Sequence, residues 1–167
     1  ASTTASGSSA FGAYALFQNT AAGNSAFGEG SLGSNTTGAR NAAFGWRALG
    51  LNQTASDNSA FGYGSLGANT AGFRNSAFGS NALASNTTGL RNAAFGWEAL
   101  RDTTLGLNNA AFGNTALRSN TVGSNNAAVG SYALGVLQDG QGNSALGAGA
   151  LGSQSTGGGN VALGHLA

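Results

Sequence analysis

The sequence predicts an all-β protein whose single domain, residues 1–167, is a parallel β-solenoid of about ten 17-residue coils. Three observations predict this fold: a tripeptide that returns at a fixed interval, 30 glycines with no proline, and a charged fraction of only 7%. Ordinary globular domains contain about 25% charged residues. Low charge with abundant Gly and Ser also occurs in disordered chains, but a fixed period indicates a repeat architecture.

The tripeptide Ala-Phe-Gly and its variants define the repeat, and we call the residues at one position of successive repeats a column. The Phe column shows one interval of 16 residues followed by eight intervals of 17. Its members are Phe11, Phe27, Phe44, Phe61, Phe78, Phe95, Phe112, Val129, Leu146 and Leu163. An Asn column runs three residues before it in nine of ten repeats, and a Leu column runs five residues after it. We expect structural ladders at Phe27, Phe44, Phe61, Phe78, Phe95, Phe112, Leu49, Leu83, Leu117, Asn41, Asn75 and Asn109.

A stack of coils follows from the shortness of the repeat. Seventeen residues cannot bury their apolar side chains alone, whereas stacked copies can, each contacting only its neighbours. The Asn-x-Ala-Phe and Ala-Leu segments are expected to be extended, with corners at Gly and Asn, which tolerate positive φ. A helix is disfavoured because each interior Gly costs about 1 kcal/mol relative to Ala. With one coil per strand spacing of about 4.8 Å, the rod should be roughly 45–50 Å long.

The direction of the Phe side chains has two possible solutions. Neighbouring residues of a strand point to opposite faces, so either Phe points into the coil, or Ala points in and a ladder of Phe is exposed. Both solutions leave a flat strip that suits close approach by another chain, and a long exposed aromatic ladder would be a liability in a monomer. We therefore expect a homo-oligomer of three parallel chains. The Asn column is expected to form a structural amide ladder.

The two columns after the conserved Gly hold the most variable residues, as in Trp46-Arg47, Tyr63-Gly64 and Trp97-Glu98. Variation inside a strict repeat indicates an outward-facing corner. The possible surface-binding residues are Trp46, Tyr63, Trp97 and Tyr132, because exposed aromatic rings stack on sugars. The alternative is that these side chains only cover neighbouring coils. A cell-surface glycan or receptor is therefore a possible partner.

The segment Asn75–Leu83, Asn-Ser-Ala-Phe-Gly-Ser-Asn-Ala-Leu, resembles repeats of phage tail-fibre proteins. It is also similar to the head repeats of trimeric autotransporter adhesins, which stack as a parallel β-roll in a trimer. The resemblance covers nearly the whole chain and implies a trimeric, surface-exposed, adhesive rod. Those adhesin repeats are shorter than 17 residues and have an aliphatic residue in place of Phe, so a wider coil or another subunit arrangement is possible. The resemblance carries no functional site over.

Several function classes are disfavoured by composition. The net charge of +1 gives no reason to expect a nucleic-acid partner. The sequence contains no run of 18 apolar residues, so we expect no membrane insertion. The chain has no Cys and one His, His165, and its five carboxylates do not repeat as a calcium-binding β-roll requires. The Gly-x-Gly-x-x-Gly matches such as Gly28–Gly33 recur with the repeat, with no helix to follow. We expect no enzyme, no catalytic residue, no metal and no cofactor.

The leading expectation is a structural or adhesive fibre segment at an extracellular, cell or virion surface. One alternative is a self-assembling filament whose subunits stack end to end. A second is an ice-binding solenoid, because a Thr column that includes Thr70, Thr87 and Thr104 could present a regular face. That column is interrupted at Gln53 and Gln138. Without an initiator Met or a signal-peptide pattern, the chain is expected to be a processed product or a fragment. Because neither end has an atypical capping repeat, we expect it to be a segment of a longer fibre.

Overall fold

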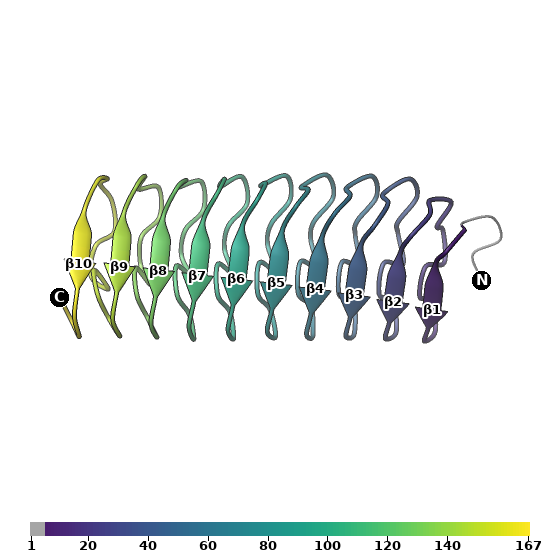
Figure 1. Ribbon diagram of the computed structural model, residues 1–167, viewed down its shortest axis with the longest axis horizontal. Coiled ribbons are helices and arrows are strands. Elements are labelled where there is room, and N and C mark those ends of the chain that lie inside the picture. Colours follow the sequence, from purple (N-terminus) through teal and green to yellow (C-terminus); the bar gives the residue numbers. More distant parts are fainter. Residues whose placement is uncertain (1–5) are drawn as a thin grey trace.

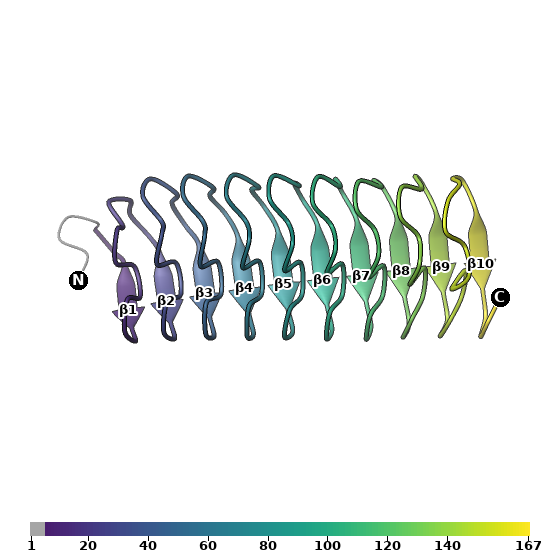
Figure 2. The ribbon, with the colours of Figure 1, turned by 180° about the vertical axis from the view of Figure 1, so that it is seen from behind.

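The computed structural model describes residues 6–167 as a rod built on a single ten-stranded sheet. Each strand has three residues: β1 Ser9–Phe11, β2 Ser25–Phe27, β3 Ala42–Phe44, β4 Ser59–Phe61, β5 Ser76–Phe78, β6 Ala93–Phe95, β7 Ala110–Phe112, β8 Ala127–Val129, β9 Ser144–Leu146 and β10 Val161–Leu163. The strands are parallel and lie in sequence order, so that β1 and β10 are at opposite ends (Figure 1; Figure 2 shows the reverse side). The prediction of an all-β parallel solenoid is confirmed.

Successive coils are held together in exact column register. Ser59, Ala60 and Phe61 pair with the residues 17 positions later in β5. The hydrogen bonds between coils continue beyond the short strands, as when Gly62 N–H donates to the Phe44 carbonyl at 2.8 Å and Leu66 N–H donates to the Ala82 carbonyl at 3.0 Å. Backbone bonding between coils therefore extends well beyond the three residues of each strand.

The core is narrow and is filled by small side chains and leucine. The Ala that precedes each Phe is buried from Ala26 to Ala145, and the Leu column is fully buried from Leu16 to Leu134. Neighbouring residues of a strand point to opposite faces. Since the central Ala of each strand points inward, the Phe that follows it points outward. The structure thus selects the second of the two solutions left open by the sequence.

The expectation that the Ala-Leu segment is extended is wrong. The Leu residues lie in a turn with left-handed backbone geometry, as shown by φ values of 51° at Leu49, 50° at Leu66 and 51° at Leu83. A left-handed conformation costs an L-residue roughly 1–2 kcal/mol, whereas full burial of a Leu side chain stabilises by about 1.5–3 kcal/mol. Burial of the inward-pointing Leu therefore offsets the strain of the left-handed turn in which it lies. The sequence pattern alone does not reveal this turn.

The Asn column forms an amide ladder inside the rod. Each side-chain oxygen accepts from the backbone N–H of the next Asn; Asn92 N–H, for example, donates to Asn75 Oδ1 at 2.9 Å. Each Nδ2 donates to a carbonyl across the coil, as from Asn75 to Gly89 at 2.8 Å. Asn41, Asn75 and Asn109 are all buried. This ladder ties the strand of one coil to its neighbour and to the opposite turn.

A second amide ladder lies eight residues after the Phe column and is incomplete. Asn52 Nδ2 donates to Asn35 Oδ1 at 2.7 Å, and Asn86 Nδ2 donates to Asn69 Oδ1 at 2.8 Å. The next residue of this column is Thr103, whose buried hydroxyl has no partner, and Asn86 Oδ1 is also left without a donor. One substitution in the repeat therefore leaves two buried polar atoms unsatisfied.

Replacing Thr103 by Asn should restore this ladder and stabilise the rod by about 1–3 kcal/mol, because it removes two unsatisfied buried atoms. The new amide would donate to Asn86 Oδ1 and accept from Asn120. Urea unfolding followed by tryptophan fluorescence measures the change. Thr88→Asn is the matched control, since Thr88 is exposed and its substitution should shift stability by less than about 0.5 kcal/mol. Equal midpoints for Thr103→Asn and the unmodified chain would contradict the prediction.

Candidate binding surfaces

The first candidate surface is the outward face of the sheet, which we call the Phe face and define as the first and third residues of β1–β10. Its Phe rings stack from coil to coil. Ring centroids are 4.7 Å apart between Phe44 and Phe61 and between Phe61 and Phe78, with interplanar angles of 5° and 6°. Phe27 and Phe112 are 40% and 41% exposed. Beyond Phe112 the same column continues with aliphatic residues.

The Phe face is long, flat and uncharged. Its second column consists of Ser and Ala, with Val161 at the end, and none of its residues is ionisable. Ten strands about 4.8 Å apart and three residues wide give a strip of about 450 Å². The Phe column is the apolar part of this strip, and contiguous exposed apolar surface commonly marks interaction sites.

The predicted surface-binding residues separate into two groups. Trp46 and Tyr63 stack on one another, with ring centroids 4.9 Å apart and planes within 10°, and the Arg47 guanidinium lies 4.5 Å from the centre of the Trp46 ring. Trp97 and Tyr132 are exposed, at 50% and 51%, and lie farther along the rod. The structure thus brings Trp46 and Tyr63 together and leaves the other two apart from them.

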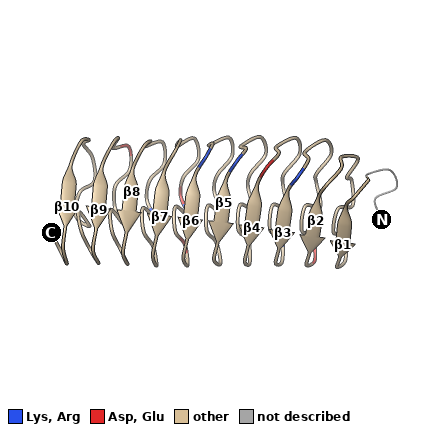
Figure 3. Ribbon diagram, in the orientation of Figure 1, with Lys and Arg blue, Asp and Glu red and all other residues tan. Residues whose placement is uncertain are grey.

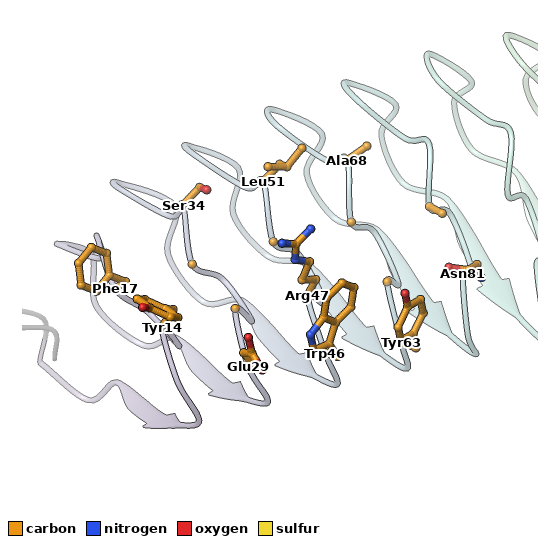
Figure 4. Close-up of a pocket in the computed structure, with 16 residues that line it drawn as sticks. Tyr14, Phe17, Glu29, Ser34, Trp46, Arg47, Leu51, Tyr63, Ala68 and Asn81 are labelled. Carbon is orange, nitrogen blue, oxygen red and sulfur yellow. The ribbon is translucent and has the colours of Figure 1, made fainter.

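The second candidate surface is a groove of about 700 Å³ that runs along the rod over successive coils (Figure 4). Trp46, Arg47 and Tyr63 line one wall, and Leu51 and Ala68 lie on the other (Figure 4). Tyr14 and Phe17, whose rings meet edge to face at 5.8 Å, lie at its N-terminal end. We call this surface the aromatic groove.

The aromatic groove was not predicted, although the sequence contains its signal. The residue after each Leu is Phe17 in the first coil, a small residue in the next four, Arg101 and Arg118 in the following two, and Gly135 and Gly152 in the last two. The four small residues are Gly33, Gly50, Gly67 and Ala84, and all of them line the groove. Missing side chains at one column therefore open the surface.

Charged side chains stand where the groove ends. Arg101 Nη1 donates to Glu98 Oε2 at 3.1 Å, and its Nε and Nη2 donate to the two Asp102 oxygens at 2.7 and 3.0 Å. The bond to Asp102 raises the pKa of Arg101 above its usual value. Arg118 Nε is 3.0 Å from Glu98 Oε2, but its N–H does not point at that oxygen. Two arginines and two carboxylates thus form a nearly neutral cluster.

The other ion pair lies on an exposed edge, and the rod as a whole carries few charges (Figure 3). Arg40 Nε and Nη2 donate to the Asp57 oxygens at 2.6 and 3.0 Å, and this hydrogen bonding lowers the pKa of Asp57. Arg40 and Asp57 are 17 residues apart and occupy the same column of neighbouring coils. Exposed pairs of this kind contribute about 0–1 kcal/mol.

The Thr column uses its hydroxyl protons within the rod. Thr70 Oγ1 donates to the Thr87 carbonyl at 3.2 Å, and Thr87 Oγ1 donates to the Thr104 carbonyl at 3.2 Å. The same contact recurs along the column as far as Thr121. These hydroxyls bind neighbouring coils and have no free proton to donate to another surface.

Residues 6–167 contain no group of three or more His, Cys, Asp or Glu side chains that could hold a metal ion. Within the same residues, no helix has the length and apolar character needed to cross a membrane. His165 follows β10, far along the rod from the aromatic groove (Figure 1).

Comparisons with protein-family models, with curated proteins and with solved structures found no match for this chain.

Proposed function

We propose that the chain is a structural or adhesive segment of an extracellular fibre and that it works as a homo-oligomer of parallel chains, three in number, joined through their Phe faces. The observation that supports this proposal is the unbroken stack of outward Phe rings from Phe27 to Phe112, at a constant spacing of 4.7–4.8 Å. Parallel chains have the same coil spacing, so one coil of each chain can face one coil of its neighbours along the whole rod.

The energetics of the Phe face favour a covered state. Phe side chains that leave water on association contribute about 25 cal/mol per Å² of apolar surface. Specific interfaces bury about 800 Å² per partner, and in a trimer each chain contacts two others. The Phe face alone supplies about 450 Å², so the columns beside it must contribute the rest of each interface.

Solution mass tests the proposal. Light scattering of the purified chain should give three times the chain mass of 16.1 kDa. Replacing Phe61 and Phe78 together by Ser should shift the species to the monomer, because Ser already occupies the other outward position of β4 and β5 and suits the strand. The matched control replaces Leu51 and Leu105 by Ser. These side chains are 55% and 53% exposed and lie outside the strands, so the control should leave the mass unchanged.

Two results would contradict the proposal. A monomeric unmodified chain would show that the Phe face is not an interface. Filaments that lengthen with concentration and are unaffected by the Phe substitutions would favour subunits stacked end to end. Electron microscopy of negatively stained samples distinguishes discrete rods from filaments.

A further inference from the structure

We propose that the aromatic groove is a binding site for an extended, neutral glycan chain, which would give the fibre a lateral adhesive site on each subunit. This inference rests on the adhesive part of the proposed function. It concerns a surface that contains no residue of the Phe face.

The groove is a local departure from the repeat. Gly33, Gly50 and Gly67 have no positive φ, so their backbone dihedral angles do not require glycine, and an added Cβ would need only a small shift from a backbone oxygen 3.0–3.1 Å away. The same column accommodates Phe17 and Arg101 elsewhere. Since large side chains fit the column, their absence over successive coils leaves a concave surface that the fold itself does not need.

The size and shape of the groove suit a chain-like ligand. Its volume of about 700 Å³ lies in the range of about 300–1,000 Å³ that is usual for small-molecule sites. It extends from Tyr14 to Asn81 (Figure 4), four coil steps at about 4.8 Å each, or about 19 Å. A linear ligand lying along the rod would contact several coils at once.

The lining combines apolar ring surface with a few polar groups, which is the chemistry that recognises sugars. Trp46 and Tyr63 are 38% and 54% exposed, and such rings present an apolar body with a polar end. The column continues after Tyr63 with Ser80, so no neighbouring ring in the next coil covers the second face of Tyr63. This open face can contact the C–H groups of one sugar residue of a chain that passes along the groove.

The polar groups of the groove suit a ligand that carries hydroxyl groups and has no net charge. Glu29 carries one negative charge and Arg47 one positive charge, and Ser34 and Asn81 add a hydroxyl and an amide. A carboxylate accepts hydrogen bonds from sugar hydroxyl groups, and guanidinium and amide N–H groups donate hydrogen bonds to the hydroxyl oxygens. Because the two charges balance, the groove favours a neutral ligand over an anionic one.

A peptide strand is a poorer match for the same surface. Peptide recognition by strand addition requires free backbone groups at an edge. Along the walls of the groove the backbone N–H groups are already used: Gly30 N–H donates to the Ala13 carbonyl at 2.8 Å, and Gly64 N–H donates to the Trp46 carbonyl at 3.0 Å. Side chains must therefore supply the contacts, as they do for hydroxylated ligands.

Affinity electrophoresis of the purified full chain through gels that contain dextran, laminarin, mannan or galactomannan tests the inference, with alginate as the anionic comparison. At least one neutral polysaccharide should retard the chain. Tyr63→Ala and Gly67→Gln should each weaken that retardation at least tenfold, the first by removing a ring and the second by filling the groove. Gln should be accommodated at position 67, because Arg101 occupies the same column. Tyr132→Ala removes an equally exposed ring outside the groove and should change nothing.

Three results would overturn the inference: no retardation by any neutral polysaccharide, retardation by alginate alone, or retardation that survives both groove substitutions. Light scattering on the same samples separates this inference from the proposed oligomer. A trimer that binds no glycan would remove only the glycan site, and a monomer that binds glycan would remove only the oligomer.

Discussion

Gly62→Ala is expected to destabilise the rod by about 4 kcal/mol or more, whereas Gly64→Ala, two residues away, should cost only about 1–2 kcal/mol. Gly62 follows β4 and has a φ of 135°. A Cβ added there would lie 2.5 Å from the Gly79 oxygen, 2.6 Å from the Gly79 carbonyl carbon and 2.9 Å from the Ser80 nitrogen. All three atoms belong to the backbone of the next coil and cannot turn away.

The cost of Gly62→Ala combines three effects. The backbone strain amounts to about 1–3 kcal/mol. Relief of the overlap requires the two coils to separate, and overpacking of this kind costs about 1–3 kcal/mol. Separation also weakens hydrogen bonds between the coils, such as the one from Gly79 N–H to the Phe61 carbonyl at 2.8 Å, at about 1 kcal/mol each.

Gly64 is the matched control because its column accepts other residues. Its φ of 62° is close to the values of 52° at Arg47 and 57° at Asn81, which hold the same position in the neighbouring coils. A Cβ at Gly64 would meet Asn81 Oδ1 at 2.9 Å, and this atom is the end of a side chain that can rotate. The substitution therefore adds little beyond the strain of a left-handed alanine.

Tryptophan fluorescence during urea unfolding reports on both sides of Gly62, because Trp46 follows β3 and Trp97 follows β6. In a solenoid each coil is stabilised by its neighbours, so a defect between two coils should uncouple the segments on either side. We expect one unfolding transition for the unmodified chain and two for Gly62→Ala. An unchanged midpoint for Gly62→Ala, or equal losses for both variants, would refute this account of the glycine that follows the Phe column in every repeat.

The sequence was sufficient to predict those features that repeat in every coil. The interval of 17 residues predicted the parallel stack, and the placement of Asn and Phe in fixed columns anticipated the amide ladder and the ring stack. The direction of Phe was open, because alternation along a strand relates Phe61 to Ala60 without saying which of them faces the core. Burial of Ala60 follows from the narrowness of the coil.

Features that depend on backbone geometry or on departures from the repeat were not predicted. The left-handed turn at Leu83 looks extended in sequence, because leucine rarely adopts positive φ and the burial that offsets its strain arises only in the stack. The aromatic groove arises from Gly50 and Gly67, and a glycine carries no sign of whether the backbone needs it. Gly67 has to be compared with Arg101, which occupies the equivalent position of the repeat, before a glycine that shapes a surface can be told from one that permits a turn.

Asn75→Asp is expected to destabilise the rod by about 4 kcal/mol at neutral pH, and the loss should diminish in acid. Asn75 is buried; its Oδ1 accepts from Asn92 N–H, and its Nδ2 donates to the Gly89 carbonyl at 2.8 Å. An aspartate keeps the first contact but places a second carboxylate oxygen against the Gly89 oxygen. Two acceptors then face each other in the core, and a charge is buried without a cationic partner.

The pH dependence follows from the protonation state of this carboxyl group. Burial and the facing carbonyl raise the pKa of Asp at position 75 in the folded state above the unfolded value of about 3.9. The folded variant therefore binds its proton more tightly than the unfolded chain does. Its stability is greatest below about pH 3.9 and is lost as the pH rises towards the folded-state pKa. When protonated, the carboxyl can donate to the Gly89 carbonyl as the amide does.

Asn108→Asp provides the control for charge without burial. Asn108 is exposed and occupies the column in which Asp57 occurs naturally, with a φ of 54° against 62° at Asp57. Its substitution should shift stability by less than about 0.5 kcal/mol. Urea midpoints of both variants relative to the unmodified chain, measured from pH 3 to pH 8, test the prediction. A loss for Asn75→Asp that does not vary with pH would show that the Asn75 amide does not donate to the Gly89 carbonyl, and that the ladder depends on packing instead of on the direction of its hydrogen bonds.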